Sequence, residues 1–277
     1  MNTDYLRSLF SLEGKTAVVT GGGGVLGSAI SCALARAGAQ VAILERREEK
    51  AIQVAGQITQ ACGEALPVHC DVLDKDSIQA ASEKVMRHFG KVDILVNGAG
   101  GNKPQATTSA ALSFFDLPAD ALQWVFDLNL IGSILPSQVF GCHMAQAKQG
   151  GILNISSMNY FRPLTRTPAY SAAKAAVSNF TMWLAVHMAQ EYSPNIRVNA
   201  IAPGFFQTEQ NHYLLHNRET GLLTPRGQTI ISHTPMARFG VPEDLIGTVL
   251  WLLSPASSFI TGVVIPIDGG FSAFSGV

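Results

Sequence analysis

The stretch Thr20-Gly21-Gly22-Gly23-Gly24-Val25-Leu26-Gly27 decides the fold that this sequence predicts. An apolar run over residues 16–20 precedes it, and a helical pattern over residues 27–37 follows it. Glycines let a phosphate approach bare backbone, and a helix N-terminus supplies free N–H groups and positive potential. The pattern G-x-G-x-x-G begins at Gly22 and lies between a strand and a helix, so the stretch predicts a dinucleotide site.

An acidic residue follows this turn at the distance that a dinucleotide site requires. Glu45 ends the second apolar run, about twenty residues on, where a carboxylate accepts hydrogen bonds from a ribose 2′-hydroxyl. Such a carboxylate repels a 2′-phosphate, which favours NAD. Arg46 and Arg47 follow directly, and they either hold the phosphate of NADP or open a helix as solvated charges. We therefore expect NAD, with NADP as the alternative.

A serine, a tyrosine and a lysine lie at fixed spacing in the second half of the chain. Ser157 precedes Tyr170 by thirteen residues, and Lys174 follows Tyr170 by four. Residues four apart share one face of a helix, and an ammonium beside a phenol lowers the phenol pKa from about 10. The pattern predicts that Tyr170 exchanges a proton near neutral pH while a serine hydroxyl holds the substrate oxygen.

Short apolar runs alternate with longer helical stretches along the whole chain. We expect strands over residues 16–20, 40–44, 66–70, 92–96, 151–155, 196–201 and 263–267, and helices over 27–37, 48–62, 120–148, 168–191 and 242–253. Strands without polar alternation, separated by helices, indicate a parallel sheet covered on both faces. The sequence predicts an α/β fold, a single doubly wound Rossmann-type domain over residues 1–277 with seven parallel strands. The irregular stretch 203–240 is expected to form a substrate loop or lid.

Composition and charge narrow the classes of partner. The chain has 277 residues, 47% of them hydrophobic, and a net charge of −1, which favours neither nucleic acid nor an anionic membrane. We expect no membrane span and no signal peptide. The four cysteines show no C-x-x-C spacing, so we expect free thiols, a cytoplasmic protein and no metal site. Charged residues make up only 14%, which suggests a symmetric assembly.

The two sites, in this order, resemble those of the short-chain dehydrogenase/reductase family over residues 12–271. Four further segments carry the same resemblance: Asp71-Val72, Asn97-Gly98-Ala99-Gly100, Pro203-Gly204-Phe205 with Thr208, and Asp268-Gly269-Gly270. One position departs from the family pattern. Val25 stands where the family usually has the middle glycine of its turn, and this β-branched residue is expected to reshape the turn unless Gly24 compensates.

The resemblance implies a role for each matching residue. Asn129, Ser157, Tyr170 and Lys174 would be catalytic, with Lys174 lowering the pKa of Tyr170 and binding the nicotinamide ribose. Asn129 would hold a water in a proton relay, or else bond the backbone inside a helix. The resemblance also implies a homotetramer. The expected cofactor contacts are Gly21, Gly23, Gly24, Val25, Leu26, Gly27, Glu45, Arg46, Asp71, Val72, Asn97, Ala99, Gly100, Tyr170, Lys174, Pro203, Gly204, Phe205 and Thr208.

Several segments resemble a narrower group, the sugar-acid oxidoreductases of this family that include D-mannonate oxidoreductase. They cover residues 154–159, 161–165, 202–211 and 233–236. Their polar side chains suit an anionic substrate, whereas a steroid or fatty-acyl pocket would be apolar. Arg162 or Lys103 would clamp a carboxylate, unless each is a solvated loop charge. The expected substrate contacts are Lys103, Ser157, Asn159, Arg162 and Gln210.

We therefore expect an NAD(P)-dependent oxidoreductase that interconverts D-mannonate and D-fructuronate. Gluconate or another polyol is the alternative substrate. A non-catalytic dinucleotide sensor is the alternative class, since a fold does not fix a function. The intact Ser157, Tyr170 and Lys174 argue against the sensor, because a sensor has no need of a tuned phenol.

Overall fold

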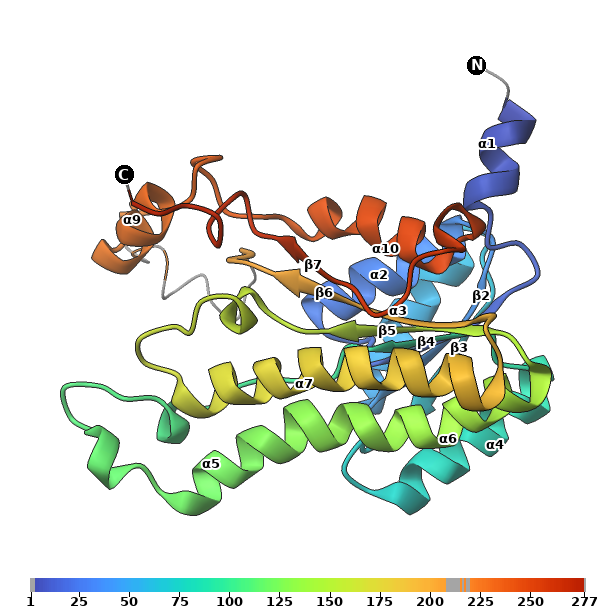
Figure 1. Cartoon of the computed structure of the whole chain (residues 1–277), viewed down its shortest axis with the longest axis horizontal. Helices are drawn as coiled ribbons and strands as arrows, with labels where there is room; N and C mark the ends of the chain where they lie inside the picture. Colours follow the sequence, from blue (N-terminus) through green and yellow to red (C-terminus); the bar gives the residue numbers. More distant parts are fainter. Residues whose placement is uncertain (1–2, 208–214, 216, 218–219, 277) are drawn as a thin grey trace.

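In the computed structural model, which describes residues 3–207, 215, 217 and 220–276, seven parallel strands form one sheet (Figure 1). Their order is β3-β2-β1-β4-β5-β6-β7, which confirms the predicted fold class. The strands are β1 (Thr16–Thr20), β2 (Gln40–Glu45), β3 (Ala65–His69), β4 (Ile94–Asn97), β5 (Gly150–Ile155), β6 (Ile196–Pro203) and β7 (Val264–Ile267).

Helices cover both faces of the sheet, and Figure 1 shows the two layers above and below it. Each layer buries its own apolar cluster, and successive strand residues such as Val18 and Val19 belong to opposite clusters. One layer holds α2 (Val25–Arg36), α3 (Glu48–Gln60) and α10 (Ile246–Leu253). The other holds α4 (Lys75–Phe89), α5 (Ala119–Phe126), α6 (Gly132–Ala147) and α7 (Pro168–His187).

In the described part of the chain, three α-helices were not expected from the sequence. They are α1 (Thr3–Phe10), α4 and α9 (Pro225–Ser232). The signals that delimit α4 are present in the chain, because Asp74 accepts hydrogen bonds from the N–H groups of Asp76 and Ser77, and Gly90 ends the helix with φ 78°. The helix α9 lies inside the stretch that was expected to be irregular, and Thr224 caps it in the same way.

The helix expected over residues 120–148 is interrupted. A π-helical turn, Asp127–Ile131, joins α5 to α6. By length and composition alone, the segment Ala119–Ala147 is long and apolar enough to cross a membrane, with an 18-residue window of mean hydropathy 1.2. That window is 44% buried, and the segment contributes Phe140 and Met144 to the core, as a core helix of a folded domain does.

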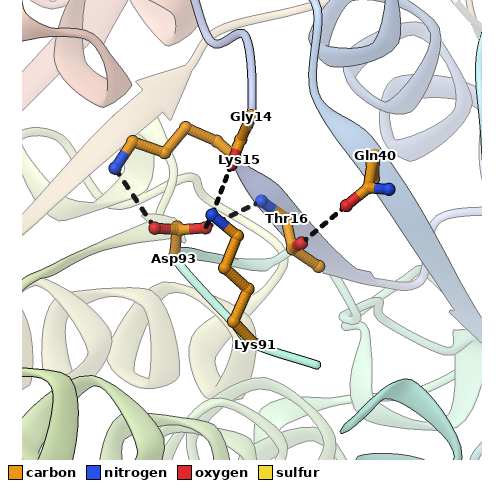
Figure 2. Close-up of polar contacts among 6 residues, drawn as sticks. All are labelled: Gly14, Lys15, Thr16, Gln40, Lys91 and Asp93. Atoms are coloured by element: carbon orange, nitrogen blue, oxygen red, sulfur yellow. Dashed lines mark hydrogen bonds and ion pairs between the residues drawn. The ribbon is translucent and has the colours of Figure 1, made fainter. Parts of the chain in front are cut away.

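A buried carboxylate ties the strands together at their N-terminal edge (Figure 2). Asp93 is 6% exposed and accepts hydrogen bonds from the Thr16 backbone N–H at 2.9 Å and from Lys15 Nζ at 3.1 Å. Lys91 Nζ lies 3.3 Å from Oδ2, the oxygen that accepts from the Thr16 N–H, and also donates to the Gly14 carbonyl. These contacts fix the start of β1 beside β4.

The opposite edge carries the functional segments. The chain runs outward from β1 to β3 and then returns to β4, so β1 and β4 are neighbours whose following segments diverge. Ligands of open α/β sheets bind at such a point, outside the carboxyl ends of the strands. The Gly-rich turn follows β1, Glu45 ends β2, and Ser157 follows β5 at this edge.

Candidate active site

A cleft of about 490 Å³ lies at the carboxyl edge of the sheet. Segments that follow six strands, β1 to β6, contribute to its wall together with residues of α5, the π-helical turn and α7. Most of the residues expected at the cofactor and catalytic sites line it. They are Gly21, Gly24, Val25, Leu26, Gly27, Glu45, Arg46, Asp71, Val72, Ala99, Gly100, Ser157, Tyr170, Lys174, Pro203, Gly204 and Phe205.

Two glycines make the turn after β1 possible. Gly21 has φ 62°, and a Cβ there would lie 2.8 Å from the backbone of Ala99. A Cβ at Gly27 would lie 2.2 Å from the Gly21 carbonyl oxygen, so the first turn of α2 packs directly on the Gly-rich turn. This close packing leaves backbone N–H groups at a helix N-terminus facing the cleft, a cradle that fits the pyrophosphate of a dinucleotide.

Val25 does not strain the turn. It is the first residue of α2, and Gly24 before it has φ −77°, which any residue adopts. The Gly24 N–H donates to the Gly21 carbonyl at 3.0 Å, and the Ser28 N–H donates to the Gly24 carbonyl at 2.8 Å. Positive φ within the turn falls on Gly21 instead, so a β-branched residue is accommodated at position 25.

The carboxylate of Glu45 lies against the Gly-rich turn. A Cβ at Gly23 would lie 3.1 Å from Glu45 Oε2, and Glu45 Oε1 accepts a hydrogen bond of 3.4 Å from the Arg47 N–H. Arg46 and Arg47 are exposed at the rim of the same part of the cleft. All three residues line the cleft, with Glu45 half-buried and the two arginines exposed.

Ser157 and Tyr170 both line the cleft, and the Ser157 hydroxyl lies close enough to lower the pKa of the Tyr170 phenol by hydrogen bonding. Ser157 is 7% exposed at the end of β5, and its hydroxyl also accepts from the Asn159 N–H at 3.3 Å. The neighbouring Ser156 donates to the Lys174 carbonyl and bonds the Ser178 hydroxyl at 2.6 Å. The paired serines thus differ in use, since one hydroxyl faces the tyrosine and the other ties β5 to α7.

The structure contradicts the expected direction of the pKa shift of Tyr170. Burial raises the pKa of its phenol, and the hydrogen bond with Ser157 offsets this only in part. Lys174 Nζ lies 5.7 Å from the centroid of the Tyr170 ring and donates to the Ile155 carbonyl at 2.7 Å. Burial also lowers the pKa of Lys174 to about 8. With both groups buried, desolvation outweighs their mutual effect.

Asn129 lies in the π-helical turn and fixes the backbone of Gly101. Its Oδ1 accepts from the Gly101 N–H at 3.2 Å, and its Nδ2 donates to the carbonyls of Gly101 at 2.7 Å and Val125 at 2.8 Å. A Cβ at Gly100 would lie 2.8 Å from Asn129 Oδ1 and 3.3 Å from Lys174 Nζ. Both amide hydrogens are therefore used by the backbone, and Asn129 holds the 98–101 turn beside Lys174.

The residues expected to contact substrate lie in different settings. Lys103 Nζ is 4.9 Å from the centroid of the Trp124 ring, and Trp124 lines the cleft. Arg162 is exposed, outside the residues that line the cleft. Asn159 is 3% exposed and donates to the Ser171 hydroxyl at 3.2 Å, which is a structural contact.

A few of the expected contacts fall elsewhere. Gly23 lies behind the turn, against Lys50 and Glu45. The Asn97 side chain is buried below the cleft, where Nδ2 donates to Ser137 Oγ at 2.9 Å and Asn154 Oδ1 at 2.8 Å. Thr208 and Gln210 lie outside the described residues. Arg47, considered from the sequence for the phosphate of NADP, also lines the cleft. Sequence reasoning missed wall residues that include Cys70, Leu73, Gly98, Gly101, Trp124, Leu128, Ile155, Ser156 and Phe206.

All four cysteines are free, as expected. Burial raises the pKa of the Cys70 thiol to about 12, so this wall residue is protonated at neutral pH. Among the residues that the structure describes, no three His, Cys, Asp or Glu side chains gather to hold a metal ion.

A family model described as short chain dehydrogenase matches residues 15–219 of the chain. The protein belongs to the short-chain dehydrogenase family. Members of this family transfer a hydride between NAD(P) and a CH–OH group, so the chain is an NAD(P)-dependent oxidoreductase.

Three proteins with related sequences align with nearly the whole chain. The uncharacterized oxidoreductase UxuB of Bacillus subtilis is 51% identical over 96% of this chain and 98% of its own length. A 2-dehydro-3-deoxy-D-gluconate 5-dehydrogenase of Escherichia coli is 35% identical over 97% of this chain and 99% of its own. A 7alpha-hydroxysteroid dehydrogenase of Escherichia coli is 33% identical over 97% of both chains.

Solved structures of similar proteins contain both nicotinamide cofactors. A Haemophilus influenzae protein proposed to be a D-mannonate oxidoreductase, solved with bound NAD, has a TM-score of 0.92 and 45% identity, over 98% of this chain and 100% of its own. A gluconate 5-dehydrogenase of Burkholderia cenocepacia, in complex with NADP and tartrate, has a TM-score of 0.85 and 29% identity. The match covers 97% of this chain and 99% of that protein's chain.

Proposed function

We propose that this oxidoreductase acts on the secondary alcohol or ketone of a sugar acid, with D-mannonate and D-fructuronate as its substrate pair and NAD as its cofactor. The observation that carries the proposal is that Ser157, Tyr170 and Lys174 lie together in the wall of a cleft that fits a dinucleotide. A non-catalytic sensor has no use for these three side chains.

The proton chemistry rests on Tyr170. Its raised pKa keeps the phenol protonated at neutral pH, so Tyr170 donates its proton to the ketone oxygen during reduction and becomes a phenolate. In the oxidation direction this phenolate takes the proton from the alcohol oxygen. Ser157 orients the same oxygen through its hydroxyl. When bound, the nicotinamide cofactor exchanges the hydride that completes the reaction.

Lys174 and Asn129 support the tyrosine. With a pKa of about 8, the Lys174 ammonium stays mostly protonated at pH 7 and stabilises negative charge that develops on the phenol oxygen. Lys174 also binds the nicotinamide ribose in this proposal. Asn129 positions the 98–101 turn against Lys174 through its bonds to Gly101.

The sugar-acid assignment is supported by relatives and by charge at the cleft. The proteins similar to this chain include enzymes of gluconate and 2-dehydro-3-deoxy-D-gluconate, and the proposed D-mannonate oxidoreductase is 45% identical. Lys103 lies beside a ring of the cleft wall, where a substrate carboxylate finds a cation. The steroid dehydrogenase is similar to the same degree as the gluconate enzymes, so the charge at Lys103 is the feature that favours an acid over a steroid.

The preference for NAD is supported by the position of Glu45. Its carboxylate lies in the wall of the cleft, against the Gly-rich turn, where it accepts from a ribose 2′-hydroxyl and repels a 2′-phosphate. Arg46 and Arg47 are exposed at the rim and stay available to NADP if the acid is removed.

We also propose that the enzyme is a cytoplasmic homotetramer without nucleic-acid or membrane partners. Trp183 and Val186 of α7 are 56% and 57% exposed, and apolar groups of this size commonly mark an interface between copies of a chain. Light scattering tests the assembly, and a mass other than four chains contradicts it.

The function is tested by a cofactor-coupled absorbance screen with the purified enzyme. The substrates are D-mannonate, D-gluconate and D-fructuronate, with D-mannitol and a long-chain alcohol as neutral references, and each is measured with NAD or NADP in the appropriate redox state. We expect D-mannonate and D-fructuronate to give the highest kcat/KM. A higher kcat/KM for gluconate or for the neutral alcohols contradicts the substrate assignment.

A further inference from the structure

A tryptophan in the cleft wall has no role in the site as the sequence predicted it. Trp124 is on α5 and lines the cleft with Leu128, Gly101 and Tyr170. It packs with Tyr170 against one small apolar cluster, which includes Val125 and Ala169. The two rings therefore share one packing cluster and both line the cleft.

Lys103 lies on the face of this ring. The distance of 4.9 Å from Nζ to the ring centroid is within the range of a cation–π contact. Among residues 3–207, 215, 217 and 220–276, no carboxylate forms an ion pair with Lys103. The ammonium beside the cleft thus has an aromatic neighbour and no counter-ion in the described part of the chain.

The backbone of Lys103 is fixed from both sides. Its carbonyl accepts from the Ala106 N–H and from Thr107 Oγ1, each at 3.0 Å. Two residues earlier, Asn129 binds the N–H and the carbonyl of Gly101. With its backbone fixed, only the long side chain of Lys103 can still move, and contact with the Trp124 ring limits the positions that it takes.

We propose that Trp124 is a specificity-determining residue that positions Lys103 to bind the carboxylate of the substrate. The proposal rests on the proposed function and names the group that recognises the acid. The Trp124 ring holds the Lys103 ammonium beside the cleft, where it pairs with the carboxylate at the end of the sugar chain. Neither Lys103 nor Arg162 is among the residues that line the cleft, but Lys103 contacts the ring of the wall residue Trp124 and Arg162 does not, so Lys103 is the residue that discriminates acids from neutral substrates.

The test measures binding without turnover, so that it does not depend on which sugar acid is the substrate. D-gluconate and D-sorbitol are titrated calorimetrically into enzyme saturated with NADH. In the wild-type enzyme we expect D-gluconate to bind more tightly. Lys103→Met should weaken D-gluconate binding about ten- to a hundredfold relative to D-sorbitol, as for loss of a charge-assisted hydrogen bond. Trp124→Leu should weaken it about two- to tenfold, as for loss of a cation–π contact.

The double variant decides whether Trp124 acts through Lys103. In the Lys103→Met background, Trp124→Leu should no longer change the ratio of the D-gluconate affinity to the D-sorbitol affinity. In the wild-type background, Trp124→Phe keeps an aromatic ring and should lower this ratio less than Trp124→Leu does. Lys75→Met, an exposed lysine on α4, is the matched control. Equal binding of D-gluconate and D-sorbitol by the wild type overturns the proposal, as does an unchanged effect of Trp124→Leu in the Lys103→Met background. A negative substrate screen with preserved D-gluconate binding would instead contradict the proposed function alone.

Discussion

Replacing Lys174 by methionine should separate stability from activity. Lys174 is 4% exposed, and burial lowers its pKa from 10.5 to about 8. Because one pKa unit corresponds to about 1.4 kcal/mol, keeping this ammonium charged in the fold costs about 3 kcal/mol at pH 7. The hydrogen bond to the Ile155 carbonyl, of about 1.5–3 kcal/mol for a charged donor, is lost in Lys174→Met. The neutral side chain of similar length should therefore leave the free energy of unfolding at pH 7 equal to or up to about 2 kcal/mol above that of the wild type.

The stability difference between Lys174→Met and the wild type should also depend on pH, with a sign that follows from the lowered pKa. A lysine whose pKa is lower in the folded state than in the unfolded state destabilises the fold while it is charged, and the penalty disappears as pH rises from about 8 to 10.5. The advantage of Lys174→Met over the wild type should therefore shrink by about 3 kcal/mol between pH 7 and pH 10.5.

Urea unfolding of both proteins at four pH values measures the difference directly, and Lys84→Met on α4 serves as the exposed control. Turnover of Lys174→Met should fall by about a hundredfold or more, since it loses the charge that supports Tyr170. A stability difference that does not change with pH would refute the assignment of a lowered pKa to Lys174.

Three further variants test other parts of the account. Glu45→Ala removes the carboxylate that repels a 2′-phosphate and should shift the ratio of kcat/KM values toward NADP; a wild type that already prefers NADP contradicts this use of Glu45. Gly27→Ala places a Cβ 2.2 Å from the Gly21 carbonyl and should weaken NAD binding in calorimetry while Gly56→Ala, an open position on α3, does not. Asp93→Ala leaves the buried Thr16 N–H without its hydrogen-bond partner and should lower the free energy of unfolding by about 1–3 kcal/mol without changing KM for NAD. Most of this loss comes from the Thr16 N–H, because Lys15 and Lys91 are 39% and 51% exposed and ion pairs of exposed lysines contribute little.

The sequence predicted the parts of this protein that local patterns encode. The strands from β1 to β7 were found within a few residues because each contains a short run of apolar residues, and Ser157 was separated from Ser156 by its spacing from Tyr170. The Gly-rich turn and Glu45 lie close in sequence to the strands that carry them, so their place at the cleft followed from the order of elements.

Features that depend on packing were not accessible in this way. The pKa values of Tyr170 and Lys174 depend on burial in the folded chain, and an expectation from their spacing alone had the wrong sign for Tyr170. Trp124 reads as an ordinary apolar position of a helix, and only the π-helical turn and the fold bring its ring to the cleft wall. Asn97 ends β4 with its side chain directed below the cleft, which a motif match does not reveal.

The central claim is that Tyr170 exchanges the proton of a sugar-acid substrate, and Tyr170→Phe tests it most directly. The change deletes one hydroxyl and keeps the ring that packs beside Trp124. Steady-state reduction of D-fructuronate with NADH should fall by about a hundred- to ten-thousandfold in kcat, while the Kd for NADH stays within a few-fold of the wild-type value. Tyr160→Phe, in the loop after Ser157, is the matched control and should keep its turnover. If Tyr170→Phe retains kcat within a few-fold of the wild type, Tyr170 is not the proton donor and the account is wrong.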